Sequence, residues 1–123
     1  MLQGLFGNAS EVSLQEVQSE FEPLLVEGEQ LLRAFRVIRD MFIFTDRRLI
    51  LVDRQGVTGK KVVYHSIPYR SITHFEVETA GMFDGDAELK LHLSGGALPV
   101  TREFKRGTDI VGVHCMLAQC ILR

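Results

Sequence analysis

The side chains best suited to metal binding or nucleophilic catalysis in this chain are four histidines and two cysteines. A catalytic Ser or Cys needs a nearby base that a third group orients, and no such set stands out. The segment Asp84-Gly-Asp86 lacks the length and the distal Glu of a calcium loop. None of the histidines is one helical turn from a second candidate ligand, because each falls in a different predicted element (His65, His74, His92 and His114). The sequence therefore predicts no metal site, no cofactor and no enzymatic activity.

The two cysteines, Cys115 and Cys120, lie five positions apart in a predicted helix. Because each helical residue turns by about 100°, the two thiols point to well-separated faces and are poorly placed to form a disulfide. The first residues carry no basic segment of the kind that opens a secretory signal, and the uncharged run at residues 110–122 is too short to cross a bilayer as a helix. We therefore expect a cytoplasmic protein with reduced thiols.

The charges are divided unevenly along the chain. Residues 1–30 contain six acids and no Lys or Arg, a net charge of −6, whereas residues 31–123 contain 14 bases and 10 acids, a net charge of +4. The simplest interpretation is an acidic helix face lying against a mildly basic body. Neither part is basic enough to predict nucleic-acid binding.

The element around which the other segments are arranged is a predicted hairpin at residues 41–53. Apolar strands at residues 41–45 and 49–52 are joined by the polar turn Asp46-Arg47-Arg48, and β-branched and aromatic side chains dominate both strands. Nearly every position is apolar, rather than every second one. This pattern favours a place in the middle of a sheet with little solvent on either face.

The remaining patterns predict one domain over residues 10–123, preceded by a short segment at residues 1–9. Ser10 or Ser13 can cap a helical extension within residues 10–26, and Pro23 limits its length. Thr108 or Asp109 can cap a final helix at residues 109–122. We expect a mainly β fold, a barrel or sandwich of seven antiparallel strands within residues 31–104 that the C-terminal helix closes. The strands are predicted at residues 31–38, 41–45, 49–52, 61–67, 71–79, 88–93 and 97–104.

Several motifs in fixed order resemble the bacterial pleckstrin-homology-like domains, over roughly residues 20–123. The resemblance implies a pleckstrin-homology fold, no enzymatic activity, and assembly into cyclic homo-oligomers, with pentameric rings as the known form. The motifs are FTDRRLILVD at residues 44–53, GKKV at 59–62, YHSIPY at 64–69, VETAG at 77–81, FDGDAELKL at 83–91 and FKRGTDI at 104–110.

The C-terminal helix is predicted to be apolar on two faces. One face suits packing on the barrel core, whereas the second requires a further cover. That cover is either another subunit or the apolar stripe of the N-terminal helix, and the pattern alone leaves both open. The core face comprises Ile110, Val113, Leu117 and Ile121, the second face Val111, Cys115, Ala118 and Leu122, and the N-terminal stripe Leu14, Val17 and Phe21.

Met82 and Phe83 are two large apolar residues in a connection between Gly81 and Asp84. Such residues are more often packed under a loop than exposed. If they point outward, they serve as an interface anchor or a membrane wedge, and the ring-forming habit of the family favours the interface. We therefore predict Met82 and Phe83, with the second helix face, as the contact between subunits.

Five basic residues form a candidate site for anions or lipid headgroups. The connection that Arg36 and Arg39 flank corresponds to the first strand–loop–strand unit, which holds inositol phosphates in lipid-binding relatives of the fold. This loop is very short and lacks the Lys–spacer–Arg-x-Arg pattern, so a solvated barrel rim is the competing interpretation. The full candidate set is Arg36, Arg39, Arg54, Lys60 and Lys61.

The groove between the strand at residues 71–79 and the terminal helix is a candidate peptide site. Relatives of the superfold add a peptide strand at this place, and Ser71, Thr73 and Phe75 would line it here. The sequence thus predicts a non-catalytic module with three kinds of partner: further copies of itself, an unknown protein, or an anionic membrane surface.

Overall fold

The computed structural model describes residues 11–37, 40–57, 60–81 and 85–122. Eight strands and two α-helices account for most of these residues, with two short 3-10 helices at connections. The elements are β1 (Glu11–Val12), α2 (Leu14–Phe21), η1 (Glu22–Leu24), β2 (Leu31–Val37), β3 (Asp40–Thr45), β4 (Arg48–Gln55), β5 (Lys61–Pro68), η2 (Tyr69–Ser71), β6 (Ile72–Thr79), β7 (Ala87–Leu93), β8 (Val100–Phe104) and α3 (Ile110–Ile121).

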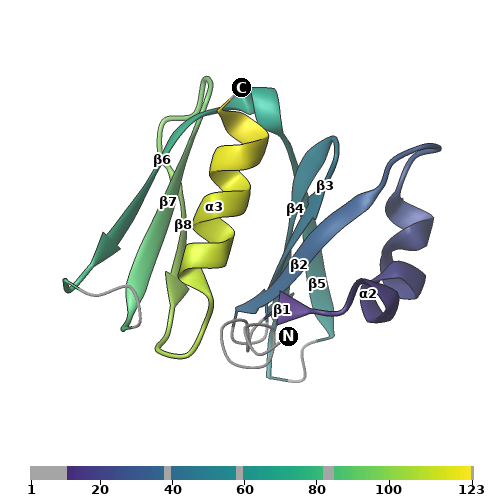
Figure 1. The fold of residues 1–123 in the computed structure, drawn as a ribbon, viewed down its shortest axis with the longest axis horizontal. Helices are drawn as coiled ribbons and strands as arrows, with labels where there is room; N and C mark the ends of the chain where they lie inside the picture. Colours follow the sequence, from purple (N-terminus) through teal and green to yellow (C-terminus); the bar gives the residue numbers. More distant parts are fainter. Residues whose placement is uncertain (1–10, 38–39, 58–59, 82–84, 123) are drawn as a thin grey trace.

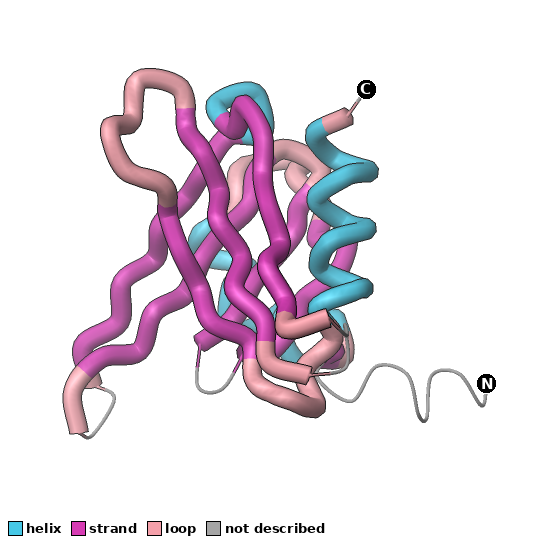
Figure 2. The backbone as a smooth tube through the Cα atoms, turned by 90° about the vertical axis from the view of Figure 1, so that its left-hand side faces the viewer, coloured by secondary structure: helices cyan, strands magenta, loops and turns pink. Residues whose placement is uncertain are grey.

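Two antiparallel sheets face each other, one in the order β1-β2-β3-β4-β5 and the other in the order β6-β7-β8. Figure 1 shows α3 beside the opening between them, with α2 on the far side of the five-stranded sheet. Figure 2 gives the same arrangement from the side, with α3 running along the open flank of the strands. The antiparallel strands and the closing helix expected from the sequence are thereby confirmed. Strand β1 was not predicted, because two residues are too few to show a pattern.

The hairpin of β3 and β4 lies in the middle of the larger sheet, as predicted. Phe44 pairs with Leu49 across the turn, and Thr45 Oγ1 accepts hydrogen bonds from the N–H groups of Arg47 and Arg48. Both faces are covered, which explains the nearly continuous apolar pattern. Phe42, Phe44, Leu49 and Leu51 face the core between the sheets, whereas Met41, Ile43, Ile50 and Val52 face α2.

The N-terminal extension is less helical than the predicted range of residues 10–26. Helix α2 spans only Leu14–Phe21, and Ser13 caps it by accepting a hydrogen bond from Gln15 N–H. Pro23 falls in η1, since a proline does not donate the hydrogen bond that would continue an α-helix. Leu24 and Val26 beyond it are 42% and 53% exposed, whereas Leu25 between them is half-buried and packs against the apolar cluster beneath α2.

Three ion pairs fasten this acidic extension to the basic body. Arg33 binds Glu11 in a two-pronged pair at 2.7 Å, and Arg54 binds Glu20 at 3.0 Å. The third pair, Arg48 with Glu29 at 2.9 Å, is the most buried of them. The predicted contact between an acidic segment and a basic body is therefore made through individual arginines.

The last strand begins later than predicted. Residues 97–99 were expected to open it, but β8 starts at Val100, and Leu98 is 82% exposed. Pro99 stands immediately before the strand, where its missing N–H group costs no ladder hydrogen bond. Helix α3 spans Ile110–Ile121, within one or two residues of the prediction.

Candidate binding surfaces

Helix α3 is held against the barrel by a capped first turn and a close glycine contact. Asp109 is the N-cap residue, and its Oδ1 accepts a hydrogen bond from Gly112 N–H at 2.9 Å. A Cβ atom on Gly112 would lie 2.9 Å from Cε1 of Phe35 and would also collide with the Asp109 carboxylate. Only glycine at position 112 therefore allows the helix to lie this close to β2.

The outer face of α3 is exposed. Val111 and Leu122 are 49% and 69% exposed, Cys115 is exposed, and Ala118 is half-buried. On the inner face, Ile110, Val113 and Leu117 are buried and Ile121 is half-buried. The two faces predicted from the sequence thus differ in burial as expected, and the interface role of the outer face stays a prediction.

The N-terminal helix does not cover this outer face, which excludes that alternative. Val17 and Phe21 of α2 pack against Ile43 and other residues on the opposite side of the five-stranded sheet, and Leu14 is 36% exposed. Met82 and Phe83, the other candidate interface residues, lie outside the described residues. Their role as a subunit contact remains a prediction.

The candidate peptide groove is partly filled by its own side chains. Phe75 on β6 packs edge-on against His114 of α3, with ring centroids 5.3 Å apart, and Thr73 donates a hydrogen bond to the carbonyl of His92. Ser71 belongs to η2 rather than to the strand. Strand β6 is nevertheless the outer strand of its sheet, so one of its backbone edges has no neighbouring strand in the described sheet order.

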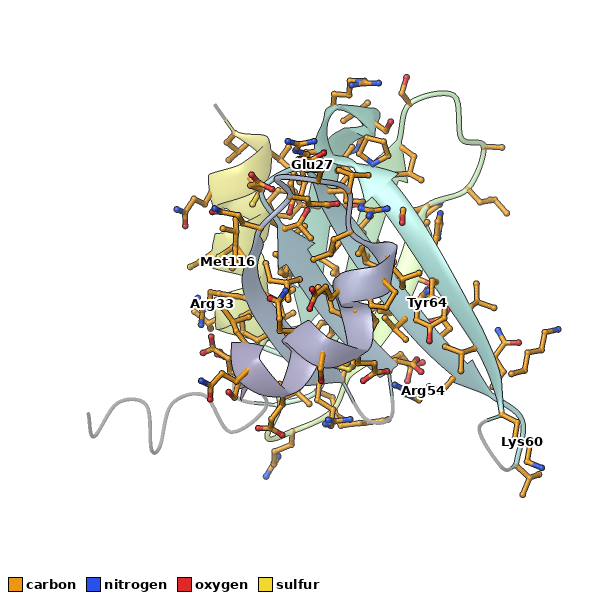
Figure 3. All side chains as sticks on the ribbon, turned by 90° about the vertical axis from the view of Figure 1, so that its right-hand side faces the viewer. Glu27, Arg33, Arg54, Lys60, Tyr64 and Met116 are labelled. Atoms are coloured by element: carbon orange, nitrogen blue, oxygen red, sulfur yellow. The ribbon has the colours of Figure 1, made fainter. Side chains whose placement is uncertain are left out.

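The five candidate basic residues do not form one free cluster. Arg54 lies beside α2 and is paired with Glu20, whereas Lys60 lies at the far end of the β4–β5 connection (Figure 3). Arg36, Lys60 and Lys61 are exposed, and none of the three makes an ion pair with another described residue. Arg39 lies outside the described residues. Three of the five positions thus stay available for an anion, and Arg54 is neutralised.

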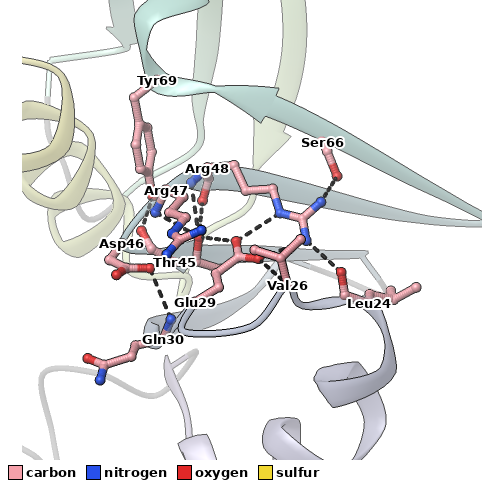
Figure 4. A network of polar contacts seen from close by, with 10 residues as sticks. All are labelled: Leu24, Val26, Glu29, Gln30, Thr45, Asp46, Arg47, Arg48, Ser66 and Tyr69. Atoms are coloured by element: carbon pink, nitrogen blue, oxygen red, sulfur yellow. Dashed lines mark hydrogen bonds and ion pairs between the residues drawn. The ribbon is translucent and has the colours of Figure 1, made fainter.

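A buried polar network at the hairpin was not anticipated from the sequence. The Glu29 carboxylate accepts hydrogen bonds from the Arg48 guanidinium, from Thr45 Oγ1 at 2.7 Å and from Val26 N–H at 3.0 Å (Figure 4). Burial alone raises the pKa of Glu29, but the hydrogen bonds from Arg48 and Thr45 outweigh it and lower the pKa to about 2. Glu29 is therefore a structural anion that fastens the extension to the hairpin.

Two histidines on the exposed face of the smaller sheet are also brought together by the fold. His74 pairs with His92 across β6 and β7, and their rings stack with centroids 4.1 Å apart. The hydrogen bond between His92 and Glu76, 2.6 Å long, lowers the pKa of that carboxyl. The sequence places each histidine at an exposed position of an alternating strand, but only the strand register shows that they are neighbours.

Within the described ranges, no group of three or more His, Cys, Asp or Glu residues is placed to hold a metal ion. The same part of the chain contains no helix with the length and apolar character needed to cross a bilayer. Cys115 and Cys120 are both free thiols. The cytoplasmic location expected from the sequence remains a prediction.

The fold is that of a known family. The family model described as Bacterial PH domain matches residues 1–121 of the chain. This chain belongs to the bacterial PH domain family. The PH fold is generally a non-catalytic binding module. Membership of this family therefore supports a binding role, without naming the ligand or the partner.

Similar proteins extend this family relationship over almost the whole chain. The pleckstrin homology domain from Shewanella amazonensis SB2B is 56% identical in sequence with a TM-score of 0.89, and the match covers 99% of this chain and 98% of that one. A DUF1696 family protein with a pleckstrin-homology domain, from Shewanella loihica PV-4, is 60% identical with a TM-score of 0.79, covering 94% of this chain and 98% of that one. The uncharacterized protein YjqA of Bacillus subtilis (strain 168) is 52% identical over 118 residues, which are 95% of this chain and 94% of YjqA. The pleckstrin-homology fold expected for this bacterial PH domain is confirmed.

Proposed function

We propose that this bacterial PH domain is a non-catalytic binding and scaffolding module that assembles as a homo-oligomeric ring. The observation that carries the proposal is the exposed apolar outer face of α3, where Val111 and Leu122 are 49% and 69% exposed. An apolar strip of this kind usually marks an interface, and burial against a second copy removes it from water. The family resemblance favours a ring of five subunits.

A ring requires that this face contact a different surface of the next subunit, because only such head-to-tail contacts close a ring of more than two subunits. Met82 and Phe83 are proposed for the same contact because they are two large apolar residues in one connection of the sequence. Several copies of one weak binding surface then act together, and the effective affinity for a multivalent partner rises.

Native mass spectrometry tests the assembly. We expect the wild type to form a closed oligomer of the 13.9 kDa chain, and Val111→Ser with Leu122→Ser to dissociate it into monomers. Leu98→Ser is the matched control, because Leu98 is 82% exposed in the β7–β8 connection and lies away from α3 in sequence. Met82→Ser with Phe83→Ser tests the contribution of that connection. A wild type that stays monomeric at micromolar concentration contradicts the ring.

The surface that the ring presents is, in this proposal, the free edge of β6. An extended peptide can add to such an edge through backbone hydrogen bonds, with Ser71, Thr73 and Phe75 beside it. Thr73→Pro disturbs the backbone of β6 and should obstruct strand addition at its free edge. Thr101→Pro on β8, the other outer strand of the same sheet, is the control. Binding of a protein partner should be lost in Thr73→Pro and kept in Thr101→Pro. The comparison uses variants whose circular dichroism spectra match that of the wild type. Equal binding to both variants argues against the β6 edge.

A second candidate function is peripheral binding to an anionic membrane. The observation that favours it is Val57, which is 102% exposed in the β4–β5 connection that also carries Lys60, with Lys61 opening β5. An apolar tip next to unpaired lysines suits the interface of an anionic bilayer. We expect salt-sensitive sedimentation with phosphatidylserine vesicles, weakened by Lys60→Gln with Lys61→Gln and unchanged by Lys105→Gln with Arg106→Gln. Equal recovery with neutral phosphatidylcholine vesicles excludes this function.

A further inference from the structure

A second kind of site lies at the opposite end of the larger sheet from the β4–β5 connection. A cavity of about 360 Å³ opens where the β3–β4 turn, η2 and the last turn of α3 meet. This volume is in the range that proteins use for small organic ligands. Its lining consists of Asp46, Arg47, Pro68, Tyr69, Arg70, Cys120 and Ile121.

The charged side chains of this cavity have an excess of positive charge. Arg47 and Arg70 are exposed, and neither guanidinium makes an ion pair or a side-chain hydrogen bond with a described residue. Asp46 is the one acid among the lining residues, and its Oδ1 already accepts a hydrogen bond from Gln30 N–H at 2.9 Å. The two arginines therefore have donors to offer to an anion that enters the cavity.

The elements that carry the two arginines are held in place by buried hydrogen bonds. Tyr69, next to Arg70, donates its hydroxyl proton to the carbonyl of Thr45 at 2.6 Å, and Thr45 in turn contacts Glu29. Burial raises the pKa of Tyr69, with a further contribution from the neighbouring Cys120 thiol, so the hydroxyl remains a donor at neutral pH. This hydrogen bond joins η2, which carries Arg70, to the end of β3, directly before the turn that carries Arg47.

We propose that this cavity binds a small organic oxyanion, with a carboxylate or phosphate head group between Arg47 and Arg70. The planar guanidinium group matches both kinds of head group through paired hydrogen bonds. Pro68 and Ile121 provide an apolar surface for a short hydrocarbon or aromatic body attached to the head group. All lining residues come from one chain, so the site goes beyond the proposed assembly and does not depend on it.

Methyl NMR spectroscopy of the full-length protein tests the proposal with three probes: inorganic phosphate, phenyl phosphate and benzoate, at an ionic strength kept constant with NaCl. The methyl signal of Ile121 should shift saturably, whereas that of Ile43, buried on the other side of the larger sheet, should not. Phenyl phosphate should bind more tightly than inorganic phosphate, because its ring contacts the apolar surface. A response to benzoate alone identifies a carboxylate ligand, and a response to the phosphates alone identifies a phosphate ligand.

Two variants show whether the arginines are responsible. Arg47→Gln with Arg70→Gln should weaken probe binding by roughly ten-fold or more, since two charge-assisted contacts are lost. Arg106→Gln is the control, because Arg106 is an exposed arginine between β8 and the first turn of α3, whereas the cavity lies at the last turn of α3, and this variant should bind the probes as the wild type does. An unchanged Ile43 signal shows that each variant is folded. Absence of a saturable Ile121 shift with all three probes, or equal weakening by both variants, overturns the proposal, and neither result depends on whether the chain forms a ring.

Discussion

At the scale of single residues, Glu29 is the one charged residue that is buried in the described part of the chain. Its side chain is 1% exposed, and it contacts the hairpin through Arg48 and Thr45. Removing a carboxylate from water is costly, so the folded state tolerates the buried Glu29 only while its hydrogen-bond donors remain in place. The same residues lie next to Tyr69 and the cavity, so the network supports both the extension and the candidate anion site.

Lowering the pH should decrease the free energy of unfolding through protonation of this carboxylate. Its pKa is about 2 in the folded protein against 4.5 in the unfolded chain, so the ionised form stabilises the fold above about pH 5. That contribution, about 3 kcal/mol, is lost progressively as the pH falls from about 5 to about 2. Urea unfolding at a series of pH values measures it.

Glu29→Gln is the variant that isolates this effect. It should lower the free energy of unfolding at pH 7 by about 2–3 kcal/mol and flatten the acid limb of the pH profile, because Arg48 loses its partner. Glu27→Gln, an exposed neighbour, should leave both quantities unchanged. Identical acid limbs in Glu29→Gln and the wild type would show that other carboxylates dominate.

Gly112→Ala is expected to change the free energy of unfolding through two physical effects of opposite sign. Helix propensity alone favours Ala over Gly by about 1 kcal/mol in a helix interior. The added Cβ, however, would lie 2.9 Å from Cε1 of Phe35, so we expect a net loss of about 1–3 kcal/mol from overpacking. Thermal unfolding followed by circular dichroism measures the sign, and a stabilised variant would contradict the close contact.

At the scale of elements, α2 acts as a cover for the outer face of the larger sheet. Val17 and Phe21 close a second apolar cluster with Ala34, Met41 and Ile43, among others, and Glu20 adds an exposed ion pair to Arg54. An exposed pair contributes little compared with a buried aromatic side chain. Packing, rather than charge, is therefore expected to hold this helix.

Phe21→Ala tests that expectation. The side chain is fully buried and its ring lies 5.9 Å from that of Tyr64, so truncation should cost about 3–5 kcal/mol of unfolding free energy. Leu14→Ala, at the exposed end of the same helix, should cost less than about 1 kcal/mol. Denaturant titrations of the two variants compare them directly, and similar costs would mean that α2 is not packed as described.

At the scale of the whole molecule, the larger sheet is a central layer with a different cover on each side. The core between the sheets, with α3, buries one face, and α2 buries the other. Three exposed surfaces remain: the outer face of α3, the basic β4–β5 end and the cavity at the opposite end. The outer face of α3 and the cavity adjoin at the last turn of this helix, where Leu122 follows Ile121, whereas the β4–β5 end is distant from both.

Thermal stability should report the assembly independently of mass spectrometry. If subunit contacts stabilise the fold, the Tm rises with protein concentration, because dissociation is coupled to unfolding. We expect this dependence for the wild type and its loss in Val111→Ser with Leu122→Ser. Scanning calorimetry over a hundred-fold concentration range measures it, and a constant wild-type Tm argues against the ring.

The sequence by itself determined the elements and their order, because the relevant signals are local. The alternation in β6 and β7, the apolar hairpin and the Asp109 cap all depend on residues a few positions apart. The family motifs are also local sequence patterns, and together they extend over most of the chain. The two-residue strand β1 and the late start of β8 were missed, since neither carries a local pattern long enough to detect.

Only the tertiary structure decided which side of the sheet α2 covers and which polar residues meet. Glu29 and Arg48 are 19 positions apart and His74 and His92 are 18 positions apart, and their contacts depend on strand register and on loop paths. The cavity likewise combines residues near 46, 69 and 120, which share no local pattern. Hydrophobic periodicity shows that a face is buried, but not which element buries it, so only the packing showed that α2 covers the larger sheet and not the outer face of α3.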